Sequence, residues 1–249
     1  MLAPGDDARG RRSLSAIFAH PDDETYATGA TIARHAAEGV RCSLYCATDG
    51  DAGKTSGIPV SSPAELGRLR RVELQAASAI LGIGTVVHGG HADGHLSQAD
   101  PDAVIAQIVH LLRVERPDVV VTFGPEGAPT RHRDHRAISR LATSAFLLAG
   151  TNAFDEQFRD GVLPFRPARL CVVTWPAPGI DDLYQALGQP PHVRVDARPW
   201  NATKHAAFLA HTSQRQHQPN FERHALTDEE WYSVVIGSAA PTGATSLFD

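Results

Sequence analysis

A regular alternation of short apolar runs and helix-compatible segments, from Leu14 to Thr174, is the feature that most constrains the fold of this chain. Apolar runs of this length predict buried strands, and Ser62-Pro63-Ala64-Glu65 between two of them is a capping-box helix start. Strands that alternate with helices form a mostly parallel sheet with helices on both faces. We therefore predict an α/β fold, a Rossmann-like three-layer sandwich. The predicted strands are 14–19, 40–48, 85–88, 117–123 and 170–174, and the predicted helices are 24–38, 62–81, 100–115 and 138–148.

The alternation weakens after Trp175, where residues 176–191 hold several prolines and turn signals. We expect an edge strand at 192–196, a helix at 200–216 and a short final element at 228–236. No linker marks off a second domain. The 249 residues are therefore interpreted as one α/β domain over 13–249, whose part from about 176 is smaller and irregular, preceded by a disordered or extended N-terminus at 1–12.

The net charge and hydropathy of the chain limit the kinds of molecule that it is expected to bind. The formal net charge is -5 and no basic run occurs, which argues against nucleic acid and anionic membrane surfaces as partners. Residues 1–12 lack the apolar core of a signal peptide, and no apolar stretch is long enough to span a bilayer. We therefore expect a soluble, cytoplasmic protein. The sequence does not indicate an oligomeric state.

Two polar clusters follow predicted strands. His20, Asp22 and Asp23 come directly after the first strand, and residues 132–135 follow the fourth. In an open parallel sheet the carboxyl ends of strands face one crevice, so the two clusters are expected to meet. A catalytic zinc usually takes three N/O ligands from the protein. The alternative, a polar turn and helix cap at the first cluster, leaves the second cluster unexplained, so the pattern predicts a metal site.

Both clusters resemble the motifs of a known family. Ala19-His20-Pro21-Asp22-Asp23-Glu24 resembles the His-Pro-Asp-Asp-Glu signature of the LmbE-like/PIG-L zinc-dependent N-deacetylases, and His132-Arg133-Asp134-His135 resembles their His-x-Asp-His motif. Weaker matches occur in the family's order. They are Thr48-Asp49-Gly50, Arg70-Arg71-Val72-Glu73-Leu74, Asp93-Gly94-His95-Leu96 and the segment 204–214.

The resemblance implies a role for each matched residue. The implied zinc ligands are His20, Asp23 and His135. Asp22 would be the general base on the zinc-activated water. His132 would act as general acid or stabilise the oxyanion, and Asp134 would orient it. Arg70 and Asp93 would be substrate contacts, by resemblance to residues that bind sugar hydroxyls. Some members carry a tyrosine where this chain has Thr130, which leaves more of the oxyanion stabilisation to His132.

The implied activity is hydrolysis of an acetyl or other acyl group from the amide nitrogen of an N-acylated amino sugar or glycoconjugate. The alternatives are a zinc-dependent amidase of a larger conjugate, a metal-dependent phosphoesterase and a non-catalytic sugar-binding protein on the same scaffold. Binding alone needs no base, so Asp22 argues against the last. Phosphoesterases commonly use two metals, whereas this sequence shows ligands for one.

Overall fold

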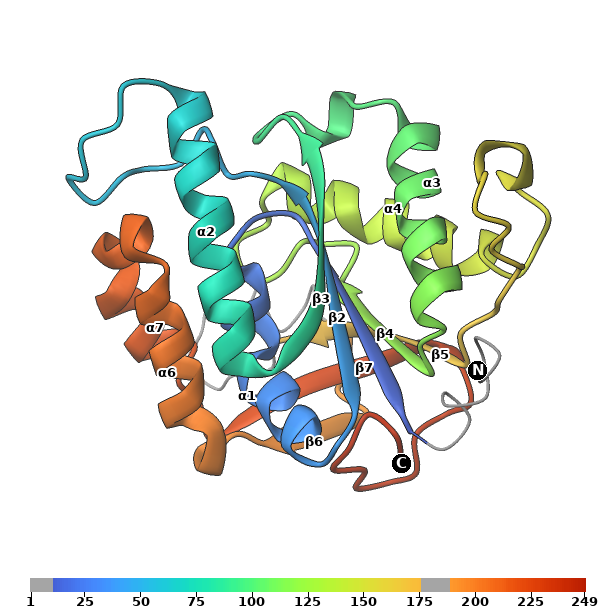
Figure 1. Cartoon of the computed structure of the whole chain (residues 1–249). Helices are drawn as coiled ribbons and strands as arrows, with labels where there is room; N and C mark the ends of the chain where they lie inside the picture. The colour runs from blue at the N-terminus through green and yellow to red at the C-terminus, as the bar shows by residue number, and fades with distance from the viewer. Residues whose placement is uncertain (1–10, 176–188) are drawn as a thin grey trace, which may run out of the picture.

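The computed structural model describes residues 11–175 and 189–249, which form a sheet covered by helices on both faces (Figure 1). The sheet order in this part of the chain is β3-β2-β1-β4-β5-β7-β6. Strands β1 to β5 pair in parallel, β7 is antiparallel to β5, and β6 is antiparallel to β7. The strands are β1 Ser13–Phe18, β2 Arg41–Thr48, β3 Ile83–His91, β4 Val119–Phe123, β5 Arg169–Thr174, β6 Val193–Asp196 and β7 Glu229–Gly237.

The helices form two layers. Helices α1, α2 and α6 pack against one another on one face, and α3 and α4 pack together on the other (Figure 1). Their bounds are α1 Asp23–Ala37, α2 Pro63–Leu81, α3 Pro101–Glu115, α4 Arg133–Leu148, α6 Asn201–Ala210 and α7 Gln218–His224, with the 3₁₀ helix η4 at Thr212–His217. The predicted mostly parallel α/β sandwich is confirmed, and its order over the first five strands is that of Rossmann-like sheets.

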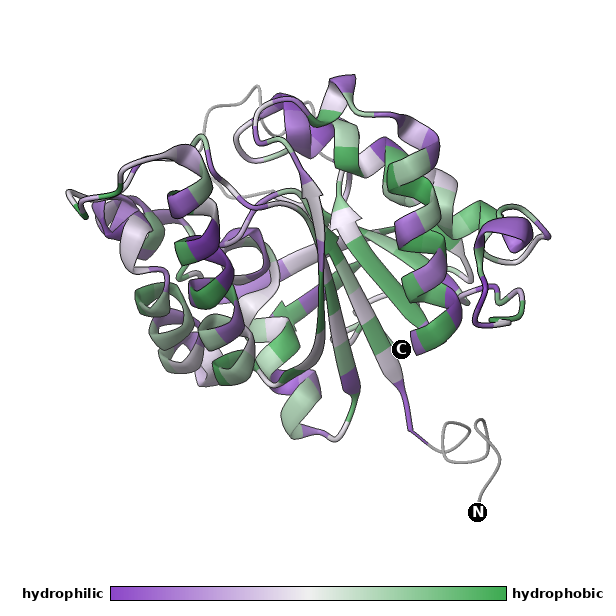
Figure 2. Cartoon of the chain, turned by 45° about the horizontal axis from the view of Figure 1, so that its top comes forward, coloured by the Kyte–Doolittle hydropathy of each residue, from purple (hydrophilic) through white to green (hydrophobic). Residues whose placement is uncertain are grey.

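Hydrophobic residues are frequent along the strands, while the helices carry both hydrophilic and hydrophobic residues (Figure 2). Every residue of β1, β4 and β5 is buried, as expected for strands covered on both sides. No helix in the ranges 11–175 and 189–249 is both long and apolar enough to cross a membrane.

Helix α4 begins earlier than the sequence predicts, at Arg133 instead of residue 138. Its N-cap is His132, whose ring Nδ1 accepts a hydrogen bond from the backbone N–H of Asp134 at 3.2 Å. Histidine is not a common N-cap residue, so no local capping signal predicted this start. The second polar cluster therefore lies on the first turn of a helix, and not in a loop before one.

The C-terminal part is more regular than predicted. Strand β7, which we expected only as a short element, lies inside the sheet between β5 and β6. Helix α6 is joined to β7 by a buried ion pair, in which Lys204 Nζ lies 2.6 Å from Glu230 Oε1. The same carboxylate accepts the backbone N–H groups of Ala30 and Thr31 at 3.1 and 2.8 Å. The predictions for residues 1–10 and 176–188 lie outside the described residues.

Candidate active site

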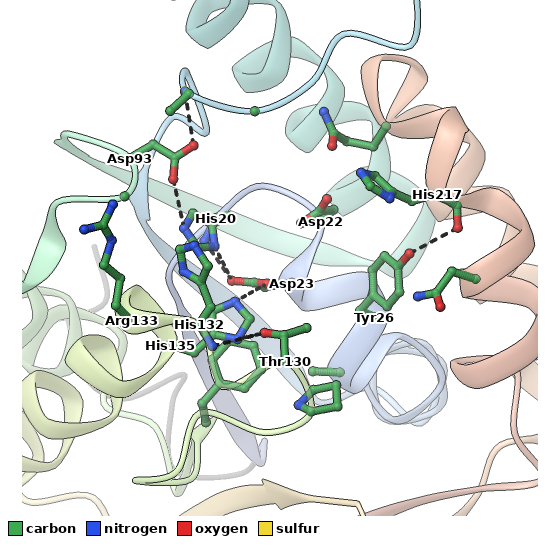
Figure 3. A pocket seen from close by; sticks show the side chains of 18 of the residues that line it. His20, Asp22, Asp23, Tyr26, Asp93, Thr130, His132, Arg133, His135 and His217 are labelled. Atoms are coloured by element: carbon green, nitrogen blue, oxygen red, sulfur yellow. Dashed lines mark hydrogen bonds and ion pairs between the residues drawn. The ribbon is translucent and has the colours of Figure 1, made fainter. Parts of the chain in front are cut away.

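The two polar clusters meet at one crevice, as predicted. Strands β1 and β4 are parallel neighbours, and their carboxyl ends carry the first and second cluster. The crevice is a cavity of about 540 Å³. Figure 3 shows His20, His132 and His135 on one side of it, with Tyr26 and His217 on the other. All eight predicted site residues except Asp134 line this cavity.

Asp23 joins the two clusters. Its Oδ1 lies 3.1 Å from His135 Nε2, and its Oδ2 lies 3.4 Å from His20 Nδ1. Oδ2 also accepts the backbone N–H of His20 at 2.8 Å, which fixes the carboxylate in place. Burial by itself would raise the pKa of Asp23, but the two imidazoles outweigh it and hold that pKa well below its usual range.

These side chains fit a divalent metal. His135 Nδ1 lies 3.2 Å from the Thr130 hydroxyl, which leaves Nε2 to face the cavity. The Phe123 ring stacks on His135 with centroids 4.0 Å apart, which further fixes the imidazole. A ligand imidazole held through its second nitrogen in this way is usual for protein metal sites. One ring nitrogen each of His20, His132 and His135 lie within 4.8 Å of one another, so geometry adds His132 as a candidate ligand.

A second group of ligand atoms overlaps the first. His20, Asp93 and Asp134 also bring donors within 4.8 Å of one another. Burial lowers the pKa of His20, but the carboxylates of Asp134, Asp23 and Asp93 raise it to a net value well above normal. Both groups use His20, so the donors in the described ranges provide for one ion at a time.

Asp22 lies beside the candidate metal ligands and contacts the guanidinium group of Arg70. Its Oδ2 lies 3.3 Å from Arg70 Nη2. Burial raises the pKa of Asp22 to about 6, even though Arg70 acts in the opposite direction. A carboxyl group with a pKa near neutrality is well suited to accept and return a proton.

His132 and Asp134 interact differently from the prediction. The carboxylate of Asp134 accepts the backbone N–H groups of Gly94 and Leu96 at 2.7 and 3.2 Å and lies 3.4 Å from His20 Nε2. Asp134 contacts the His132 ring through its backbone N–H, whereas we expected the Asp134 side chain to orient that ring. Burial, with His20 and His135 nearby, lowers the pKa of His132. The neutral ring accepts at Nδ1 and so carries its proton on Nε2.

The two predicted substrate contacts are both engaged within the protein. Arg70 donates to the carbonyls of Pro21 and Gly50 besides contacting Asp22. Asp93 Oδ1 lies 3.1 Å from His20 Nε2, and its Oδ2 accepts the backbone N–H of Ala52 at 3.1 Å. Both residues line the cavity, but Arg70 is only 3% exposed. A substrate group would have to share these side chains with their protein partners.

The far wall of the cavity was not predicted. Tyr26 and His217 lie on it (Figure 3), and Trp175, Gln214 and Asn220 also line the cavity. Gln214 lies in the segment 204–214 that resembles the family, but neither motif nor periodicity pointed to the aromatic residues. Aromatic side chains at sequence positions far apart become a wall only when α1, the end of β5 and η4 are brought together.

The chain also matches a known protein family in sequence. Residues 15–146 match the model of the PIG-L family, described as GlcNAc-PI de-N-acetylase. The chain belongs to the PIG-L family. This confirms the resemblance drawn from the two motifs, and with it the predicted class of deacetylases.

Two curated PIG-L relatives carry the same name, 1D-myo-inositol 2-acetamido-2-deoxy-alpha-D-glucopyranoside deacetylase. The protein of Rhodococcus opacus is 37% identical over 180 residues, which cover 64% of this chain and 60% of that protein. The protein of Thermobispora bispora is 32% identical over 273 residues, which cover 91% of this chain and 83% of that protein. The second match extends the relationship through the C-terminal part.

Solved structures share the architecture of this PIG-L chain at lower identity. N,N'-diacetylchitobiose deacetylase from Pyrococcus horikoshii has a TM-score of 0.73 at 22% identity, covering 91% of this chain and 84% of that one. The 4-carboxy-2-hydroxymuconate hydratase GalB from Pseudomonas putida KT2440 has a TM-score of 0.75 at 19% identity, covering 93% and 99%. These likenesses show the fold alone, since a deacetylase and a hydratase both have it.

Proposed function

We propose that this protein is a zinc-dependent N-deacetylase that hydrolyses the acyl amide of an N-acetylglucosamine-type conjugate. The observation that carries the proposal is the meeting of His20, Asp23 and His135 with Asp22 and His132 at one end of a cavity of about 540 Å³. The relatives named as deacetylases of a 2-acetamido-2-deoxy-glucopyranoside support this substrate class.

His20, Asp23 and His135 are the proposed metal ligands, because two imidazoles converge on one carboxylate there. Two histidines and one carboxylate form a donor set that zinc commonly has in hydrolases. A zinc ion held by them would supply a Lewis acid that polarises the amide carbonyl and makes water a nucleophile at neutral pH.

Asp22 is the proposed general base. It takes a proton from the water whose oxygen attacks the amide carbon, and the Arg70 contact at 3.3 Å keeps its carboxylate in place. His132 is proposed to donate its Nε2–H to the oxygen that gains negative charge. When the carbon–nitrogen bond breaks, Asp22 returns its proton to the leaving amine, so that water is consumed and an acid and an amine are formed.

Other activities fit the cavity less well. A two-metal phosphoesterase would need two separate ligand groups, whereas both candidate groups in the described residues share His20. A zinc-dependent amidase of a larger conjugate would use the same chemistry, and the aromatic far wall decides which leaving amine is accepted. We propose a cytoplasmic location for the enzyme.

The test is a panel of N-acetylated sugars and glycoconjugates, including N-acetylglucosaminyl-inositol, with acetate and free amine both quantified. We expect the two products in equal amounts, and about one zinc per chain in the active protein. Release of phosphate from matched phosphate esters without acetate release, or full activity after complete removal of metal, would overturn the proposal.

A further inference from the structure

The backbone of Asp22 is strained. Its φ of 104° and ψ of -24° lie in the left-handed region, which residues other than glycine rarely adopt. Strain of this kind persists only where the surroundings hold it, and it concentrates at functional sites. Asp22 occupies the N-cap position of α1, yet its side chain makes no capping hydrogen bond. The carboxylate therefore does not cap the helix but lines the cavity, and other groups must hold the backbone.

The peptide unit between Pro21 and Asp22 is held from both ends. Its carbonyl accepts a hydrogen bond from Arg70 Nη2, and its N–H donates to Glu24 Oε2 at 3.0 Å. The orientation of this peptide plane helps to set φ of Asp22. Arg70 and Glu24 therefore act together on the backbone that directs the Asp22 carboxylate.

Glu24 is itself held by a residue from the other end of the chain. His211 Nε2 lies 2.9 Å from Glu24 Oε1, and the Thr25 hydroxyl donates to the same oxygen at 2.6 Å. Glu24 and His211 are both 0% exposed, and neither lines the cavity. They reach the reaction only through Asp22.

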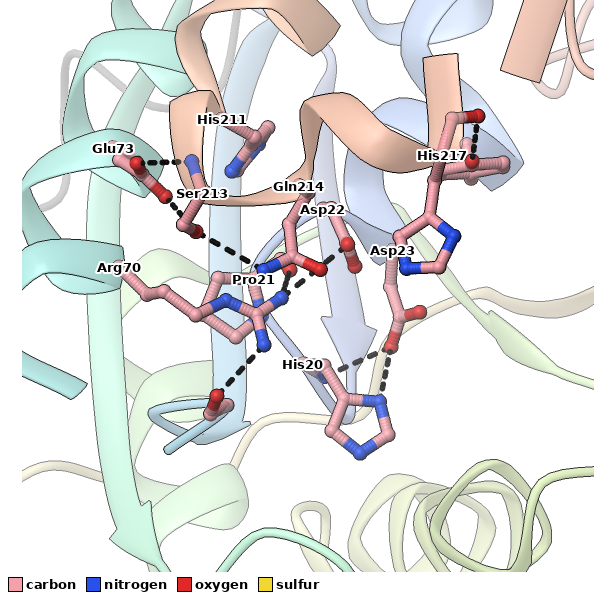
Figure 4. A network of polar contacts seen from close by, with 12 residues as sticks. His20, Pro21, Asp22, Asp23, Arg70, Glu73, His211, Ser213, Gln214 and His217 are labelled. Atoms are coloured by element: carbon pink, nitrogen blue, oxygen red, sulfur yellow. Dashed lines mark hydrogen bonds and ion pairs between the residues drawn. The ribbon is translucent and has the colours of Figure 1, made fainter. Parts of the chain in front are cut away.

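His211 is placed by the junction of α6 and η4. The next turn is anchored to α2, because Glu73 accepts the backbone N–H and the hydroxyl of Ser213 at 2.7 and 2.6 Å. Figure 4 shows Arg70 and Glu73 of α2 together with His211 and Ser213 around Pro21 and Asp22. One face of α2 thus fixes both the carbonyl of Pro21 and the segment that carries His211.

A contribution to stability does not by itself explain the buried pair of Glu24 and His211. A buried carboxylate–imidazole pair gains little over well-packed apolar side chains, because both groups lose their hydration. His211 Nδ1 is also buried and has no hydrogen-bond partner among the described residues, which adds a further cost. The pair retains one specific property that an apolar pair lacks, namely an acceptor aimed at the N–H of Asp22.

We propose that Glu24 and His211 are positioning residues, which clamp the Pro21–Asp22 peptide so that Asp22 keeps the orientation its proton transfer needs. The inference rests on the proposed function for the role of Asp22. The clamp itself is a statement about the backbone and is testable without any activity.

The catalytic arm compares Glu24→Ala and His211→Ala with Glu24→Gln. We expect both alanine variants to lose about 100-fold in kcat, the scale for a misplaced catalytic group, with KM and zinc content near wild type. Glu24→Gln keeps an amide oxygen for the Asp22 N–H and should recover most of kcat. The matched control is His35→Ala, since His35 is also 0% exposed and lies 3.1 Å from a glutamate, Glu38, at the far end of α1. It should lose stability but not kcat.

The second arm measures hydrogen exchange of the Asp22 backbone amide by NMR. We expect faster exchange in Glu24→Ala and His211→Ala, with the amides of β1 and β4 unchanged. Unchanged Asp22 exchange in both variants would overturn the clamp. Faster exchange with wild-type kcat, or an equal loss of kcat in His35→Ala, would overturn its role in positioning. If the wild type deacetylates nothing, the proposed function fails while this arm still decides whether the clamp exists.

Discussion

Asp23 Oδ1 lies 3.1 Å from His135 Nε2, so the carboxyl ends of β1 and β4 are joined by one contact between two candidate metal ligands. The pair distinguishes His135 from His132, whose Nδ1 is committed to the backbone of Asp134. We therefore predict different effects on metal binding when His132 and His135 are replaced.

His135→Ala should lose the metal, because it removes a donor that converges on Asp23. His132→Ala should keep the metal and lose turnover. The measurement is zinc per chain by elemental analysis after dialysis, alongside acetate release. Loss of zinc from His132→Ala with retention in His135→Ala would reverse the assignment and place His132 in the ligand shell.

Asp22→Asn should retain zinc and lose about 10²- to 10⁴-fold in kcat, the usual contribution of a positioned general base. The amide is close in size to the carboxylate, so the packing around Arg70 is kept. Asp160→Asn is the control, since Asp160 pairs with His110 on the surface and should not affect turnover. Equal kcat in Asp22→Asn and wild type would remove Asp22 from the base role.

The value of kcat/KM should fall as the pH is lowered, because Asp22 takes up a proton. Burial raises the pKa of Asp22 to about 6, and a base acts only in its deprotonated form. A bound cation lowers that pKa, so we expect an acidic limb of kcat/KM centred at or below about 6. A pH profile of the wild type should show this limb, and residual activity in Asp22→Asn should lack it. Persistence of the same limb in the variant would assign it to another group.

Thr130→Val should weaken zinc binding by about 10- to 100-fold, because the change removes the hydroxyl 3.2 Å from His135 Nδ1 and leaves the side-chain shape unchanged. Competition with a chelator of known affinity measures the effect. Thr143→Val, which removes a hydroxyl bonded to Ser139 within α4, is the control and should bind zinc normally. Identical affinities in the two variants would show that Thr130 does not support the ligand.

Lys204→Met should lower the free energy of unfolding by about 3–5 kcal/mol, since it leaves the buried Glu230 carboxylate without its cation. Urea unfolding measures this change. His205→Gln on the same helix removes a more exposed contact with Glu222 and should change stability by less than about 0.5 kcal/mol. A loss in Lys204→Met no larger than that in His205→Gln would contradict the structural importance of the ion pair between α6 and β7.

Much of the fold could be predicted because its signals are local. The apolar runs and the Ser62 and Asp100 helix starts appear in the structure within a few residues of their predicted bounds. The meeting of the two clusters also followed from sequence, since polar residues after two parallel strands face one crevice. His20, Asp23 and His135 accordingly come together as expected, although their roles as ligands stay predictions.

The sequence by itself determined the α/β class, the family and the two polar clusters that meet at the crevice, because periodicity, capping and motif spacing are local properties. Only the tertiary structure decided that β7 enters the sheet, that Asp134 binds the loop after β3, and that His211 reaches Glu24 beneath Asp22. Those contacts join segments far apart in the chain. Their formation depends on which surfaces pack together, and no local pattern encodes that.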